Sequence, residues 1–267
     1  MDAPNRQQRL AALRDSIADI ERKPALAEAR VRVSDTAEGF PALAGGLLQE
    51  VFTPELRNAG VPLGFALGQA RGLLTEQRIA VIYLQLAGES QQLGVPYGPG
   101  LLSFGFHPDA LVLVRPASMA ELLWAAEEAL ACRAVAAVVA DISRHSRLLD
   151  FTVSRRLSLR ATDTGGSIFM LGYGSERQAS AAHLRWCLSP VPSSRRLYDG
   201  AAPGPLRWRA QLEKGTLIKQ TEYMLGWTEN GFAAFAPQPR HTGRNGSGPA
   251  LPRAVPAYLA DRFFETA

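Results

Sequence analysis

Residues 53–61, TPELRNAGV, are where phosphate-binding chemistry is expected, because they separate an apolar run from a helical pattern. A working phosphate loop surrounds the phosphates with backbone N–H groups, bridges them with a lysine and holds magnesium through a Ser or Thr hydroxyl. This loop is degenerate: it offers Arg57, Asn58 and Gly60, but Ala-Gly-Val stands in place of Gly-Lys-Thr. We therefore assign no nucleotide-binding or catalytic residue and expect neither a cofactor nor enzyme activity. The alternative is an ATPase in which Arg57 replaces the lysine.

Metal chemistry needs clustered carboxylate, histidine or cysteine ligands, and the sequence offers only isolated ones. Asp141 follows the apolar run 134–140, where nucleotide-binding folds carry a magnesium-orienting carboxylate, but it stands alone. Its alternative role is to cap the following helix or turn. Cys132 and Cys187 form no CxxC motif, which predicts buried, reduced thiols rather than a disulfide or a zinc site. We expect no metal ion.

Arginine supplies most of the positive charge in a chain whose net charge is +4. One stretch concentrates five of these side chains, which are the candidate DNA contacts: Arg144, Arg147, Arg155, Arg156 and Arg160. The guanidinium fork matches phosphate geometry, so this stretch predicts weak, salt-sensitive DNA binding. The alternative is a solvated helix face with ion pairs to Asp141 or Asp150.

Two helical patterns are candidate partner contacts. Residues 4–22 predict an amphipathic helix that ends before Pro24, and one apolar stripe follows its length: Leu10, Leu13, Ile17 and Ile20. A second helix, predicted from the capping pair Ser118 and Glu121, places Trp124 and Glu128 on one face. Either face could instead pack on the protein's own core.

Alternating strand and helix patterns predict an α/β fold with a mostly parallel sheet covered on both faces. Short, nearly continuous apolar runs predict buried strands at 47–52, 79–86, 110–114, 134–140 and 167–171. Helices are predicted from Pro62, from Ser118 to about Cys132, and over 148–162. After residue 172 the strand patterns at 184–192, 206–214 and 222–235 follow one another without helices, which predicts antiparallel hairpins at the sheet edge.

The order of several segments resembles the ImuA family, RecA-like proteins associated with the SOS response of bacteria. The segments that carry the resemblance are GG…L.EVF (45–52), YGPGLLSFGFHPDALVLVRP (97–116), ELLWAAEEAL (121–130), AVAAVVADI (134–142), SRRLSLRA (154–161) and LRWCLSPVPS (184–193). The resemblance implies a reduced RecA-like core, related to RecA and to the division inhibitor SulA. It places residues 50–66 at the phosphate-loop position and Asp141 at the acidic strand end.

The same resemblance implies work in DNA repair by error-prone translesion synthesis. The implied partners are ImuB, a Y-family polymerase homologue, and an error-prone replicative-type polymerase; contact with RecA and self-association are further expectations. We therefore expect a non-hydrolytic accessory protein of the error-prone complex that these partners form, a mutasome. A SulA-like inhibitor of the division protein FtsZ is the other alternative.

These patterns divide the chain into four parts. We expect an N-terminal amphipathic helix at 1–24, a linker at 25–43, the reduced RecA-like core at 44–236, and a flexible Pro/Gly-rich tail at 237–267. No apolar run approaches the roughly 20 residues of a membrane-spanning helix. A cytoplasmic protein without membrane contact is expected.

Overall fold

The structure is a computed structural model that describes residues 40–103, 105–143, 146–193, 202, 204–218, 221–228 and 231–235. The chain divides into two compact units, Met1–Phe235 and Ala236–Ala267, and the description concerns the first. The predicted helix at 1–24, most of the linker and the predicted tail lie outside the described residues, as do Leu10, Leu13, Ile17, Ile20 and Arg144.

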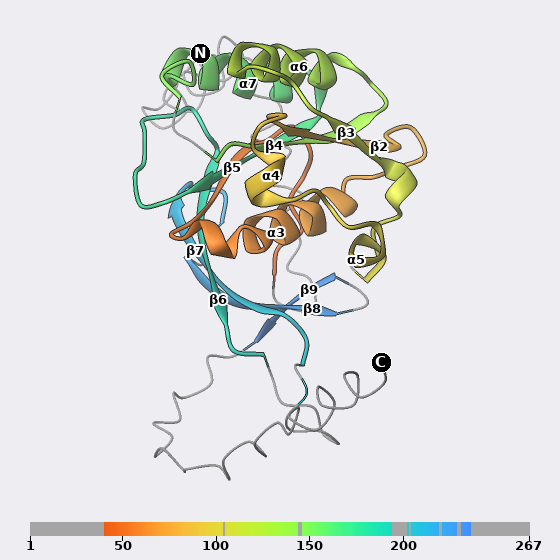
Figure 1. The fold of residues 1–267 in the computed structure, drawn as a ribbon, viewed down its shortest axis with the longest axis vertical. Helices are drawn as coiled ribbons and strands as arrows, with labels where there is room; N and C mark the ends of the chain where they lie inside the picture. The colour runs from red at the N-terminus through yellow and green to blue at the C-terminus, as the bar shows by residue number, and fades with distance from the viewer. Residues whose placement is uncertain are drawn as a thin grey trace, which may run out of the picture. The chain divides into compact units, whose positions relative to one another are not determined.

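A single sheet organises the described part of the chain, and most of it is parallel (Figure 1). Its strands, in spatial order, are β3 (Leu111–Val114), β2 (Ala80–Gln85), β4 (Val135–Asp141), β5 (Ser167–Tyr173), β1 (Leu48–Thr53), β6 (Leu184–Val191), β7 (Arg207–Lys214), β8 (Glu222–Thr228) and β9 (Gly231–Phe235). The strands from β3 to β6 pair in parallel, and β6 to β9 pair antiparallel.

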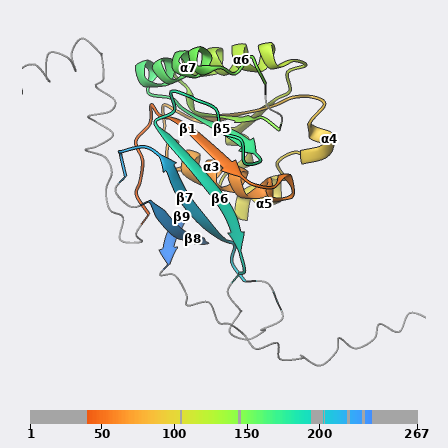
Figure 2. The same ribbon diagram turned by 90° about the vertical axis from the view of Figure 1, so that its left-hand side faces the viewer.

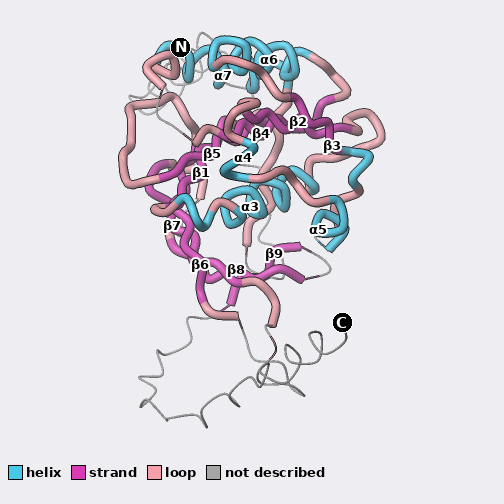
Figure 3. The backbone as a smooth tube through the Cα atoms, in the orientation of Figure 1, coloured by secondary structure: helices cyan, strands magenta, loops and turns pink. Residues whose placement is uncertain are grey.

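Helices cover both faces of the parallel strands. Helix α3 (Gly60–Arg71) lies on one face, while α6 (Met119–Ala131) and α7 (Phe151–Thr164) lie side by side on the other (Figure 2). Short helices stand in the connections: η1 (Leu56–Asn58) precedes α3, and α4 (Ser90–Leu93), α5 (Gly98–Ser103) and η2 (Pro108–Ala110) lie between β2 and β3. Figure 3 shows α4 and α5 in the helix colour. None of the described helices is long and apolar enough to cross a membrane.

Local side-chain hydrogen bonds fix where α6 and α7 begin. The Ser118 hydroxyl accepts a bond from the Glu121 backbone N–H at 3.3 Å, and the Asp150 carboxylate accepts one from Val153 N–H at 2.8 Å. Each bond satisfies a backbone donor that the first helical turn leaves open. At its other end α7 stops at Gly165, which adopts φ 74°, a conformation that glycine reaches without a Cβ penalty. The predicted cap at Ser118 is confirmed.

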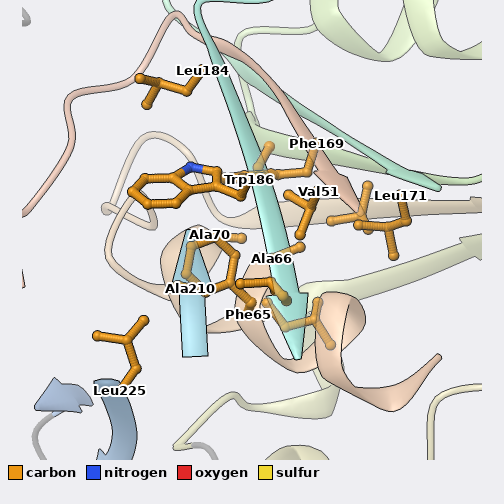
Figure 4. Packing of buried hydrophobic residues seen from close by; sticks show 14 of the residues in the cluster. Val51, Phe65, Ala66, Ala70, Phe169, Leu171, Leu184, Trp186, Ala210 and Leu225 are labelled. Carbon is orange, nitrogen blue, oxygen red and sulfur yellow. The ribbon is translucent and has the colours of Figure 1, made fainter. Parts of the chain in front are cut away.

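The core between the sheet and α3 is built on aromatic side chains (Figure 4). Phe65 of α3 lies with its ring centroid 5.6 Å from that of Trp186 on β6, and both side chains are fully buried. The Trp186 indole N–H donates to the Gln49 side-chain oxygen at 3.1 Å, so its burial leaves no open donor. A second core, around Leu122, Leu157 and their neighbours, lies under α6 and α7.

The predicted α/β class, four of the five predicted buried strands and the antiparallel C-terminal strands are confirmed. The prediction of a buried strand at 110–114 is wrong in one respect: β3 forms there, but it lies at the sheet edge with Val112 and Leu113 exposed. Two further details differ. Strand β6 was expected within an antiparallel hairpin, but it also pairs in parallel with β1, so it joins the two parts of the sheet. Helix α3 starts at Gly60 rather than at Pro62, because the first turn tolerates a residue without an N–H group.

We expect Phe65→Ala to lower the free energy of unfolding by about 3–5 kcal/mol, because it removes a fully buried ring from a packed aromatic cluster. Trp124→Ala is the matched control: that side chain is 66% exposed, and the change should stay within about 0.5 kcal/mol. Urea unfolding followed by circular dichroism measures both. Equal effects would contradict the assignment of the core.

Candidate functional site

The carboxyl ends of four parallel strands bring a set of polar side chains together on the α3 face of the sheet. Successive side chains along a strand point to opposite faces of the sheet. A residue two positions after a core residue on the α3 face therefore points to that face as well. Thr53, Gln85, Asp141 and Tyr173 occupy these positions at the ends of β1, β2, β4 and β5. In open α/β sheets, ligands bind at this end of the strands, which makes the cluster the candidate site.

Both oxygens of Asp141 accept hydrogen bonds from tyrosines on the neighbouring strands. The Tyr83 hydroxyl of β2 donates to Oδ2 at 2.5 Å, and the Tyr173 hydroxyl of β5 donates to Oδ1 at 2.7 Å. The side-chain amide of Gln85 donates to the Tyr83 oxygen at 3.2 Å. Asp141 is only 2% exposed. The alternative in which Asp141 caps the following turn is therefore wrong, since its carboxylate joins three strands instead.

Burial dominates the electrostatics of this cluster. Desolvation raises the pKa of the Asp141 carboxyl above its usual value, the two tyrosine bonds oppose this rise, and the nearby Glu89 carboxylate adds to it. The pKa values of Tyr83 and Tyr173 are raised by burial and then by the charge of Asp141. Within the described part of the chain, neither Asp141 nor Glu89 forms an ion pair. The site is therefore acidic, and the hydroxyl groups of Tyr83 and Tyr173 already bind both oxygens of the Asp141 carboxylate.

Three buried polar atoms near the ends of these strands make no hydrogen bond to a described residue: Thr53 Oγ1, Gln85 Oε1 and Ser143 Oγ. The Ser143 backbone N–H donates to the Glu89 carboxylate at 3.2 Å, which holds the segment after β4 close to Glu89. The three atoms, Thr53 Oγ1, Gln85 Oε1 and Ser143 Oγ, are the hydrogen-bonding groups still available at this end of the sheet. They could contact a small polar group.

The degenerate loop holds its arginine side chain at the surface. Arg57, on η1, forms an ion pair with Glu55, and its side chain is 79% exposed. Gly60 is the first residue of α3, and a Cβ there would meet no atom within 4 Å. A larger side chain would therefore fit at this position, so packing does not require glycine there. The structure places Arg57 on the surface and Asp141 in the interior.

The described residues include no group of three or more His, Cys, Asp or Glu side chains that could hold a metal ion. Both cysteines are free thiols. Cys132 is exposed, so the prediction that it is buried is wrong, because it follows the last turn of α6 rather than facing the core. Cys187 is partly buried, and burial raises the pKa of its thiol.

The candidate DNA contacts that the structure describes lie on or just before α7. Arg147, Arg155, Arg156 and Arg160 are all exposed. Arg156 forms an ion pair with Glu127 of α6, whereas the other three form none with a described residue. None of these four arginines forms the alternative pair with Asp141 or Asp150: Asp141 is buried against tyrosines, and Asp150 caps α7. Two exposed arginines of α7, Arg155 and Arg160, and Arg147 just before it therefore have no ionic partner among the described residues.

The partner-contact candidates on α6 also face solvent. Trp124 is 66% exposed, and Glu128 is exposed one turn further along the same face. The prediction that Trp124 could instead pack on the protein's own core is wrong. An exposed Trp beside a carboxylate is a common form of protein contact.

A cavity of about 420 Å³ lies beside the ends of β4 and β5 and the start of α7, with Tyr173 of the candidate site in its lining, and sequence patterns did not predict it. Its lining includes Ser143, Ser154, Glu176 and Ser180, from the segments that follow β4 and β5 and from α7. Glu50, also in the lining, pairs with Arg185 at 2.6 Å. Its serines lie far apart in sequence, so only the fold brings them together.

Fold and site together define an α/β protein with a mostly parallel sheet and a buried carboxylate at the strand ends. No family model matches the chain. It is similar to Protein ImuA of Caulobacter vibrioides, from strain NA1000 / CB15N and from strain ATCC 19089 / CIP 103742 / CB 15. Each is 32% identical over 170 residues, which cover 60% of this chain and 65% of the relative, just under two thirds of its length. This similarity supports assignment of the chain to the ImuA family.

The raised pKa of Asp141 predicts a pH dependence of stability. The folded protein holds this proton more tightly than the unfolded chain, whose carboxyl has the ordinary value of 3.8. The stabilisation is therefore complete below that value and is lost as pH rises through the raised pKa. We expect Asp141→Asn to remove this loss, since an amide does not titrate.

Urea unfolding at several pH values from about 4 to 7 measures this effect. Asp163→Asn, at an exposed position of α7, is the matched control and should keep the wild-type profile. Identical profiles for the wild type and Asp141→Asn would refute the raised pKa.

Proposed function

We propose that the protein is a non-hydrolytic, RecA-like accessory protein of a DNA-damage-induced mutagenesis system and works beside an ImuB-like partner. The similarity to Protein ImuA supports the family context. The proposed action is binding of protein and DNA, rather than chemistry on a nucleotide.

The single observation that supports a non-hydrolytic function is the burial and hydrogen bonding of Asp141. Catalysis of phosphoryl transfer relies on a cation and a lysine that neutralise the transferred group, with a carboxylate free to hold the metal. Here each oxygen of Asp141 accepts a tyrosine hydroxyl, and the carboxylate is buried. The loop lacks the lysine, and Arg57 pairs with Glu55. These features favour a scaffold over the ATPase alternative.

A RecA-like core is proposed from the arrangement of the same elements. Strand β1 lies in the middle of the sheet and leads through the degenerate loop into α3. Asp141 ends β4, which is separated from β1 by β5 alone. The degenerate loop and Asp141 therefore follow the carboxyl ends of two parallel strands with one strand between them, which supports the proposed RecA-like core.

We expect the full-length protein to co-purify with an ImuB-like Y-family homologue after DNA damage, and a variant ending at residue 236 to report whether the last 31 residues are needed. Trp124→Ala tests the exposed face of α6 in the same assay and should weaken the association while leaving the fold intact. Absence of the homologue from every preparation would refute the partner proposal.

Two other outcomes would favour the alternatives. Saturable ATP binding that is lost in Arg57→Ala and Asp141→Ala would support an ATPase. Filamentation on overexpression that does not depend on a polymerase partner would support a SulA-like inhibitor of FtsZ.

For the exposed arginines of α7 we expect weak DNA binding that does not depend on base sequence. If two or three phosphates are contacted, affinity for a duplex should fall by about 10- to 40-fold between about 50 and 200 mM salt. Arg155→Ala combined with Arg160→Ala should reduce both the affinity and its dependence on salt, whereas Arg57→Ala, also exposed but on another surface, should not. Fluorescence anisotropy measures these titrations, and equal affinity at both salt concentrations would exclude phosphate neutralisation.

A further inference from the structure

Among the described strands, β3 is the outermost strand at the parallel end of the sheet and pairs only with β2. Its four residues, LVLV, include no polar side chain. Val112 is 45% exposed and Leu113 is 40% exposed, and successive side chains point to opposite faces. An edge strand also presents unpaired backbone N–H and C=O groups, which make it a template for another strand. The apolar edge is therefore suited to strand pairing.

Opposite charges flank this apolar strand. Asp109, in η2 just before β3, has a side chain that is 89% exposed, and Arg115 follows β3 directly and is also exposed. His107 lies 3.3 Å from the Asp109 carboxylate, within the same turn. A strand with a negative amino end and a positive carboxyl end complements itself only in the antiparallel direction. In a parallel pair, the like charges would face one another.

We propose that β3 pairs antiparallel with β3 of a second copy of this chain, about a twofold axis through Val112. In an antiparallel pair, residues that face each other point to the same side of the sheet. With the axis at Val112, Leu111 faces Leu113 of the second copy, and Arg115 approaches the η2 turn that carries Asp109 of that copy. With the axis at Leu113, Arg115 would face Leu111 instead. Charge complementarity therefore selects the first register.

The interface is isologous, because the same surface serves both copies. It closes the exposed edge, so assembly stops at a dimer at this end of the sheet. The adjoining α5 packs near η2, which precedes β3, and its Leu102 is 55% exposed. This proposal is independent of the partner and the DNA contacts proposed above, and each can fail without the other.

Cysteine cross-linking of the full-length chain tests the register. In a Cys132→Ser, Cys187→Ser background, Val112→Cys lies on the proposed axis and should form a disulfide-linked dimer on mild oxidation. Leu113→Cys is the matched control, since it faces residue 111 of the second copy and should cross-link several-fold less. Equal cross-linking of the two variants, or none by Val112→Cys, would overturn the proposal.

Analytical ultracentrifugation of the full-length protein at up to about 100 µM tests the dimer itself. Arg115→Asp should weaken it about tenfold, because two symmetric ion pairs become repulsive. Asp109→Arg combined with Arg115→Asp should restore it, whereas Arg155→Asp, on α7, should have no effect. A monomeric wild type, or a charge exchange that fails to restore the dimer, would overturn the proposal; pairing of β3 with another protein's strand would appear as such a monomer.

Discussion

The structure depends on a parallel sheet that must be covered on both faces. Strand β4 shows this most clearly, because all seven of its residues are buried. A strand of this kind cannot leave one face to water, so α3 must lie on one side of the sheet and α6 and α7 on the other. The same constraint applies to the last residue of β4. Asp141 lies within this covered layer, and its charge must be satisfied there by hydrogen bonds rather than by water.

The site follows from that burial. A carboxylate at the end of a covered strand can be held by a cation or by hydrogen-bond donors. In this chain the donors are Tyr83 and Tyr173, one on each neighbouring strand. Their positions two residues beyond Val81 and Leu171, which belong to the core, direct the hydroxyl groups toward the same point. The loop after β1 carries Arg57 on the surface, paired with Glu55.

Sequence patterns predicted the layers better than the site. Apolar runs identified β1, β2, β4 and β5 because a buried parallel strand is apolar on both faces, and Ser118 marked the start of α6 through its cap. Asp141 was identified by its position, but its tyrosines were not, since Tyr83 and Tyr173 are 58 and 32 residues away in the chain. The parallel pairing of β6 with β1 was missed for a similar reason: the local pattern of a strand does not specify its neighbour.

The two tyrosine bonds to Asp141 also have a mechanical meaning. They link β2, β4 and β5 across the sheet at the carboxyl ends of these strands. Sliding one of these strands by a single residue, about 3.3 Å, would break a bond inside the protein interior. The two bonds therefore hold the carboxyl ends of the three strands in register. This arrangement resists shear between its strands, and it can hold surfaces in fixed relation without a cycle of movement.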